Sequence, residues 1–143
     1  MRRTGVAAVL ALLVAACGAG SAVSDFGTVV KGAKGTTVRV ELRPGQRFSL
    51  AVADNPSVGD NWDLVEVPDP KVASFISEEH ESESDAPGAG GTLYFVFNSK
   101  HPGTTEIRLR DCWRCGQNKT PSDEQSRQQS GEAIFAVTVS PPK

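Results

Sequence analysis

The feature that most constrains this chain is a series of short segments in which apolar and polar residues alternate. In the segment 36–42, Val38, Val40 and Leu42 occupy every second position, with charged side chains between them. A period of two is typical of a half-buried β-strand, and no long helical period is present. Turn residues separate the segments, which predicts an all-β sandwich. The seven predicted strands are 36–42, 46–53, 62–67, 72–77, 92–98, 104–110 and 133–140.

The connections between these segments lead to three expectations. The strands 92–98 and 104–110 flank a His-Pro-Gly turn and are expected to form a hairpin. The acidic run 78–85 lacks apolar residues and the spacing of a calcium loop, so a solvated loop is favoured over a metal site. The segment 116–132 is polar and offers nothing to pack, which predicts a mobile loop.

The first residues indicate the compartment. Two arginines precede an apolar stretch over 6–16, which ends in small residues before Cys17. This order predicts a lipoprotein signal peptide, residues 1–16, whose removal leaves Cys17 as the acylated N-terminus. An ordinary signal peptide cut nearby, or a buried thiol, are the alternative interpretations. Residues 17–34 are then the lipidated cysteine and a flexible tether, and 35–143 a folded domain outside the cytoplasm, held at the bacterial cell membrane by lipid alone.

Charge and cysteine content narrow the partners. The formal net charge is −2 and no basic stripe is present, which argues against a polyanionic partner such as nucleic acid. The chain has three cysteines, and a lipidated Cys17 leaves Cys112 and Cys115 as the remaining pair. In an oxidising compartment this pair is expected to form a local disulfide.

No arrangement of side chains predicts catalysis. His80 lies in the acidic run and His101 in a turn, and neither belongs to a hydrolase or metal-binding motif. Cys112 and Cys115 have the CxxC spacing of redox sites, but no helical pattern follows them to lower a thiol pKa. A structural clamp is therefore favoured over a disulfide oxidoreductase. Neither enzyme activity nor a cofactor or metal is expected.

Three loops are predicted to form a binding surface. The segment 55–61 combines a proline, which restricts the backbone, with Gly59, which permits a turn. A glycine-rich turn covers 88–91, and Trp113 lies in the corner between the two later cysteines. Exposed loops on a rigid scaffold commonly carry function, so these loops are expected at one end of the sandwich. Trp62, which follows the first loop, is expected in the core.

The same loops resemble those of a known family. Asn55-Pro56-Ser57-Val58-Gly59, followed by Trp62, resembles the Asn-Pro-Thr-Thr-Gly loop of the chagasin family of cysteine-peptidase inhibitors, inhibitor family I42. Gly88-Ala89-Gly90-Gly91 matches the Gly-x-Gly-Gly motif of that family, and Trp113 follows in the family's order. The similarity covers roughly residues 35–140.

This resemblance implies an immunoglobulin-like β-sandwich that blocks papain-like cysteine peptidases with three loops. Residues 55–59 would enter the catalytic cleft, while residues 88–91 and Trp113 would brace its walls. Val58 departs from the family in replacing a threonine, and Cys112 stands where the family has a proline. A disulfide to Cys115 would then supply the stiffness that proline provides elsewhere.

Together these features predict a lipid-anchored, monomeric inhibitor that reversibly occludes the cleft of papain-like cysteine peptidases. The alternative is a surface lipoprotein that binds another protein or an envelope ligand through the same sandwich. Only the first interpretation predicts inhibition in a papain titration.

Overall fold

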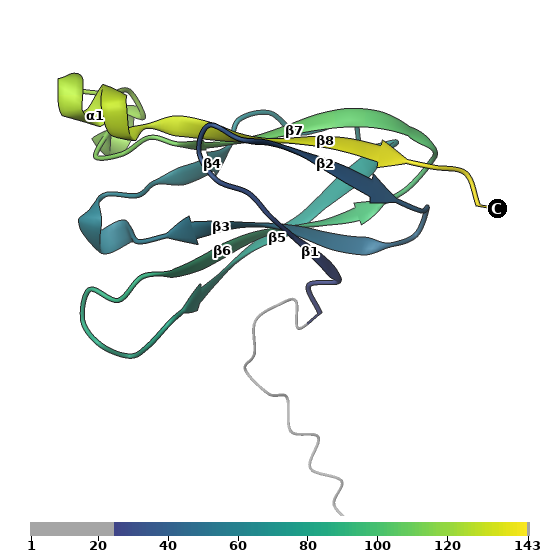
Figure 1. Cartoon of the computed structure of the whole chain (residues 1–143), viewed down its shortest axis with the longest axis horizontal. Coiled ribbons are helices and arrows are strands. Elements are labelled where there is room, and N and C mark those ends of the chain that lie inside the picture. The colour runs from purple at the N-terminus through teal and green to yellow at the C-terminus, as the bar shows by residue number, and fades with distance from the viewer. Residues whose placement is uncertain (1–24, 143) are drawn as a thin grey trace, which may run out of the picture.

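The computed structural model describes residues 25–142, which form two four-stranded sheets packed on each other (Figure 1). The strand order is β1-β3-β6-β5 in the first sheet and β2-β8-β7-β4 in the second. The predicted all-β sandwich is confirmed, with eight strands in place of seven. The elements are β1 (Thr28–Lys31), β2 (Thr37–Leu42), β3 (Arg47–Asp54), the 3₁₀ helix η1 (Pro56–Val58), β4 (Trp62–Leu64), β5 (Ala73–Ser82), β6 (Gly91–Ser99), β7 (Gly103–Asp111), the 3₁₀ helix η2 (Gly116–Asn118), α1 (Glu124–Gln129) and β8 (Gly131–Val139).

Alternating apolar side chains form one hydrophobic core between the sheets. In the first sheet Phe48 lies opposite Phe97, and their rings stack with centroids 5.4 Å apart. In the second sheet Ile107 lies opposite Phe135, and all four side chains are fully buried. Trp62 is also buried, as expected, and its indole N–H donates to a backbone carbonyl of β3 at 3.1 Å. A core of this kind gives the loops a rigid base.

The predicted hairpin between 92–98 and 104–110 is wrong, because the two strands belong to different sheets. β6 lies between β3 and β5, so both of its hydrogen-bonding edges are already occupied. β7 pairs with β8 instead, from Gly103 opposite Val139 to Asp111 opposite Gly131. A short turn can carry the chain across the core to the opposite sheet, and alternation along the sequence does not distinguish this crossing from a hairpin.

The predicted tether 17–34 is wrong from Asp25 onward, because these residues belong to the folded domain. β1 pairs in parallel with β3, from Thr28 opposite Phe48 onward. Just before it, the ring of Phe26 stacks on Tyr94 with centroids 4.4 Å apart. β1 has only four residues, and three of them are exposed, so it lacks the apolar pattern that identified the other strands. The predicted lipidation site, Cys17, lies outside the described residues.

The acidic run 78–85 is not a loop over its whole length, because β5 extends to Ser82. After a bulge at 75–77, β5 stays paired with β6 as far as Ser82 opposite Gly91. β5 is an edge strand of the first sheet, where charged side chains reach solvent and oppose aggregation. Only residues 83–90 connect it to β6. β4 is shorter than predicted, because it ends at Leu64.

The segment 116–132 is also more regular than predicted, since it forms η2, α1 and the start of β8. The Asp123 carboxylate caps α1 by accepting a hydrogen bond of 2.8 Å from the Ser126 backbone N–H. Ser126 is buried, and its hydroxyl donates to the Trp113 carbonyl at 2.6 Å. Polar contacts therefore hold this segment without apolar packing. Within residues 25–142, no helix has both the length and the apolar character needed to cross a membrane.

Candidate functional site

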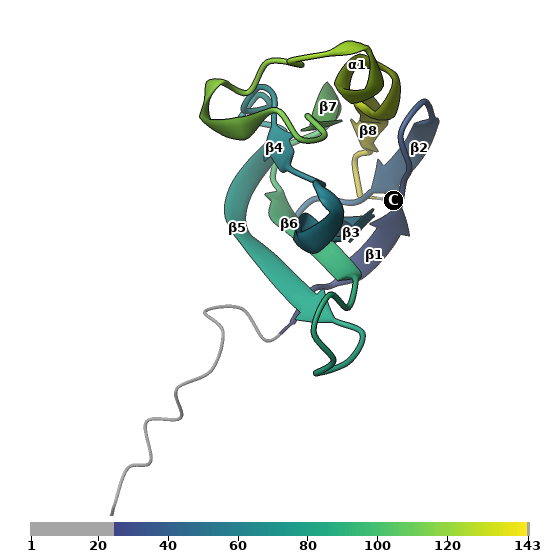
Figure 2. The same cartoon turned by 90° about the vertical axis from the view of Figure 1, so that its left-hand side faces the viewer.

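Three loops lie together at one end of the sandwich (Figures 1 and 2). We call residues 55–61 the first loop, 83–90 the second loop and 112–130 the third loop, and the three together the loop edge. Figure 2 views this end and shows the first loop between the other two. Asn55 of the first loop donates through its amide Nδ2 to the Gly88 carbonyl at 3.2 Å. On the other side, the Arg114 backbone N–H donates to the Gly59 carbonyl at 2.9 Å. The predicted clustering of the loops is confirmed.

The first loop is held in shape by its own side chains. The Asn55 side-chain oxygen caps η1 by accepting a hydrogen bond of 3.2 Å from the Ser57 N–H. The Asp60 carboxylate accepts a second one, of 2.8 Å, from the Asn55 N–H, which closes the loop. Gly59 has a φ of 120°, which other residues rarely adopt. Pro56, Ser57 and Val58 are left exposed at the tip.

The second loop contacts the first through the Gly88 carbonyl, which also accepts a hydrogen bond of 3.3 Å from the Ser57 hydroxyl. Gly88 is exposed, while Ala89 and Gly90 are half-buried beside it. Gly91 is buried at the start of β6, where a Cβ would lie 2.2 Å from the backbone oxygen of Glu81. The Gly-x-Gly-Gly motif thus combines a contact to the first loop with close packing of two strands.

The third loop begins with the Cys112–Cys115 disulfide, which confirms the predicted pairing. Both cysteines are buried, and Trp113 between them is half-buried. The Ser130 hydroxyl accepts a hydrogen bond of 2.9 Å from the Trp113 N–H. Together with the Ser126 contact to the Trp113 carbonyl, this fixes the backbone of Trp113 on both sides.

Asp111 connects the bases of the first and third loops, and sequence reasoning missed it. Its fully buried carboxylate accepts hydrogen bonds from the Asn61 N–H at 2.7 Å and from the Lys34 ammonium at 2.8 Å. The same ammonium donates to the Gln129 carbonyl at 2.7 Å. Lys34 and Asp111 are 77 positions apart in the sequence, so only the fold brings them together.

A small cleft of about 280 Å³ lies under the first loop, and acidic side chains line it together with His80. Burial raises the pKa of Asp54 above its ordinary value, and the pairing with His80 at 3.4 Å opposes that rise. Burial also raises the pKa of Asp60, with Asp111 nearby adding to the effect and the Asn55 N–H opposing it. The carboxylate that closes the first loop is therefore costly to keep charged.

Stability should consequently depend on pH through Asp60. The ordinary pKa of an aspartate carboxyl is 3.8, and that of Asp60 in the folded protein is higher. As pH rises above 3.8, the unfolded chain therefore loses the Asp60 proton before the folded protein does, and the free energy of unfolding falls. The Asp60→Asn variant lacks this titration. We expect the thermal midpoint of the wild type, relative to Asp60→Asn, to rise as pH is lowered from about 7 to about 4. A difference that stays constant, or changes in the opposite direction, would contradict the assignment.

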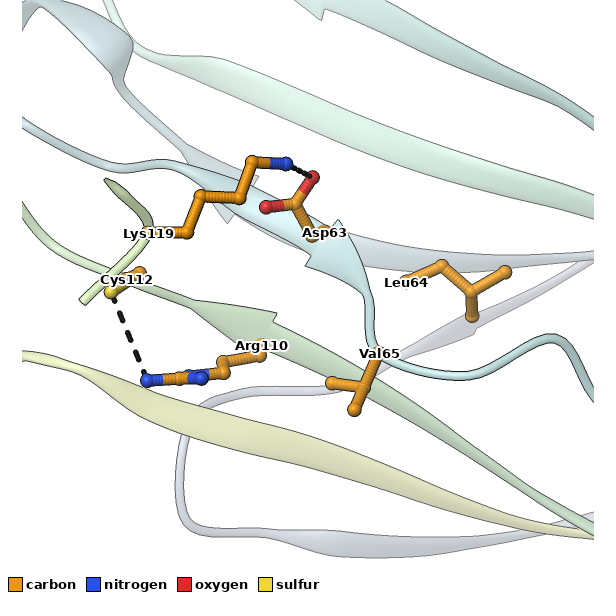
Figure 3. Close-up of a pocket in the computed structure, with 6 residues that line it drawn as sticks. All are labelled: Asp63, Leu64, Val65, Arg110, Cys112 and Lys119. Carbon is orange, nitrogen blue, oxygen red and sulfur yellow. Dashed lines mark hydrogen bonds and ion pairs between the residues drawn. The ribbon is translucent and has the colours of Figure 1, made fainter. Parts of the chain in front are cut away.

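A second pocket, of about 250 Å³, lies on the flank of the third loop (Figure 3). The Lys119 ammonium donates to the Asp63 carboxylate of β4 at 2.8 Å, which links the segment after η2 to the second sheet. Arg110 points toward the Cys112 sulfur, at 3.9 Å. These contacts brace the third loop against β4 and β7, and they present no nucleophile paired with a base.

The disulfide is expected to contribute both to stability and to the position of Trp113. It closes a short loop, for which the chain-entropy relation still gives about 2 kcal/mol, and both of its cysteines are buried. The Cys112→Ser/Cys115→Ser variant should therefore have a lower thermal midpoint than the wild type and bind a partner roughly three- to tenfold more weakly, because Trp113 is less well positioned. Equal affinity in a variant shown to lack the bond would refute the role in binding.

Preformed loops that project from a rigid sandwich define a protein that binds a partner. Its chain matches the model of the chagasin family peptidase inhibitors, I42, over residues 41–127. The chain therefore belongs to this family of inhibitors, as the sequence motifs predicted, and the family is not one of enzymes.

Among similar solved structures, the first two below support the fold. The cysteine protease inhibitor EhICP2 from Entamoeba histolytica has a TM-score of 0.50 at 15% identity, covering 78% of this chain and 94% of that chain. Amebosin has a TM-score of 0.54 at 18% identity, covering 79% of this chain and 97% of that chain. PbICP-C, solved in complex with falcipain-2, has a TM-score of 0.49 at 15% identity, covering 81% of this chain and 100% of that chain. A search of the curated proteins found no match to this sequence.

Proposed function

We propose that this protein reversibly inhibits papain-like cysteine peptidases by filling the catalytic cleft with its loop edge. The observation that carries the proposal is the hydrogen bonding of the first loop to both of its neighbours, at Gly88 and at Arg114. Membership of a peptidase-inhibitor family supports the same function.

The geometry explains how a loop can block a peptidase without being cleaved. The exposed tip at Pro56–Val58 is held by hydrogen bonds within the loop and to both flanking loops. Little conformational entropy is lost when such a loop is bound, which favours tight association. A rigid backbone also resists the distortion that would place a peptide bond against the catalytic cysteine. Residues 88–90 and Trp113 flank the tip and are suited to contact the two walls of a cleft, whereas Gly91 is buried and supports the second loop from β6.

Titration of papain and a panel of related cysteine peptidases with the purified protein tests this proposal. We expect competitive inhibition that reverses on dilution, with an inhibitor of unchanged mass recovered afterwards. A serine peptidase serves as the negative control. Failure to inhibit any member of the panel would reject the proposal and favour binding of another protein or an envelope ligand.

We further propose that Cys17 anchors the protein to the bacterial membrane through lipid. The support is the order of basic, apolar and small residues before Cys17. When the full chain is expressed in bacteria and the cells are dissolved in a detergent that separates into two phases, the wild type should be found in the detergent-rich phase. The Cys17→Ser variant should move to the aqueous phase, and wild-type protein without bound lipid would reject the anchor.

A further inference from the structure

We propose that Arg114 forms an ion pair with a carboxylate on the rim of the peptidase cleft. Arg114 lies where the third loop meets Val58 and Gly59 of the first loop. The inference rests on the proposed inhibitory function and adds the chemistry of the partner's surface at this point.

The side chain of Arg114 is held in place before any partner binds. Its φ of 52° is unusual for a residue other than glycine and turns the chain toward the first loop. Its Nε–H donates to the Val58 carbonyl at 3.2 Å, and its guanidinium lies 4.3 Å from the centre of the Trp113 ring. Stacking on an indole stabilises a cation and restricts its rotamers.

The charge of Arg114 is not neutralised within residues 25–142. The other two cations of the third loop are paired there, Lys119 with Asp63 and Arg127 with Glu124, each at 2.8 Å. Arg114 is in no ion pair of the described chain, and only its Nε has a hydrogen-bond acceptor. Its terminal nitrogens are therefore available to form the paired hydrogen bonds that a carboxylate accepts.

The surroundings favour such a pair. Arg114 is exposed, and Val58 beside it is an apolar residue with 47% of its surface accessible. When Val58 is covered by a partner, water is displaced next to the guanidinium, which strengthens an ion pair there. Because the guanidinium is already oriented, little side-chain entropy is lost when it pairs. The fitting partner surface is an acidic side chain next to an apolar wall.

The Arg114→Gln variant tests the proposal, with Arg43→Gln as a control that removes an equal charge. Arg43 is exposed in the turn between β2 and β3, at the pole opposite to the loop edge. With the peptidase that the wild type inhibits best, Arg114→Gln should inhibit about tenfold more weakly at low ionic strength. The loss should shrink at high ionic strength, because salt screens the wild-type pair. Arg43→Gln should behave like the wild type.

The salt dependence separates an ion pair from a brace between loops. Arg114→Lys keeps the charge but lacks the planar group that stacks on Trp113, so it should inhibit more weakly than the wild type while retaining its salt dependence. If Arg114→Gln weakens inhibition equally at all salt concentrations, Arg114 is only a brace and the ion pair is rejected. Unchanged inhibition by Arg114→Gln also rejects it. A wild type that inhibits no peptidase would instead refute the proposed function itself.

Discussion

The Gly59→Ala variant is expected to inhibit about 30-fold more weakly than the wild type, the effect typical of a residue central to an interface. A Cβ at this position would lie 2.5 Å from the Cγ of Arg114 and 3.2 Å from the indole nitrogen of Trp113. It would also require alanine to adopt a φ of 120°. The first loop would therefore separate from the third loop, and the loop edge would lose its shape. Inhibition constants and thermal midpoints of both proteins measure the effect.

Two further variants isolate the cause of this loss. Gly45→Ala imposes alanine at a φ of 80°, in a turn at the opposite pole with no atom within 4 Å of the new Cβ. It should lower the thermal midpoint and leave inhibition unchanged. Gly59→Ala/Arg114→Ala removes the side chain that the new Cβ meets, and it should be more stable than the sum of the two single changes predicts. Full potency in Gly59→Ala would show that the contact between the first and third loops is not needed.

Asp111 is the last residue of β7, beneath the loop edge, and its replacement by alanine is expected to be the most destabilising of these changes, costing about 2 to 3 kcal/mol. Removal of its buried carboxylate would leave the Asn61 N–H and the Lys34 ammonium without this acceptor. The estimate is at the lower end for a buried pair, since Lys34 is 34% exposed and can be hydrated in the variant. Inhibition should also weaken, because Asn61 and Gln129 tie this pair to the first and third loops. Urea unfolding measures the loss of stability.

The matched control is Asp63→Ala, which removes the ion pair with Lys119 on the flank of the third loop. Its two side chains are 39% and 60% exposed, so the loss should be at most about 1 kcal/mol. An Asp111→Ala variant as stable as Asp63→Ala would mean that the buried carboxylate does not hold the loops.

Local patterns in the sequence predicted the strands and the loops, because both depend on neighbouring residues. Alternation identified the inward-facing Phe48 and Phe135, and the Asn-Pro and glycine-rich motifs marked two of the loops. Membership of an inhibitor family then indicated that the loops act together in inhibition.

The pairing of strands that are far apart in the sequence could not be predicted from these local patterns. β6 and β7 follow each other yet lie in different sheets, and the position of each is set by partners far along the chain. β1 is ordered by β3 rather than by its own pattern. The contact of Lys34 with Asp111 likewise depends on how β2 and β7 are placed in the second sheet. Arg114 was missed for a related reason, since its backbone conformation and its stacking on Trp113 leave no pattern in the sequence.

The parallel pairing of β1 with β3 determines at which end of the sandwich the chain enters the domain, relative to the loop edge. β3 runs toward the loop edge, so β1 runs in the same direction, and the chain enters the domain at the far pole. An attachment made upstream of Asp25 would thus direct the tip at Pro56–Val58 outward. On the proposal that Cys17 carries lipid, a peptidase arriving from the surroundings would meet that tip first, without having to approach the membrane.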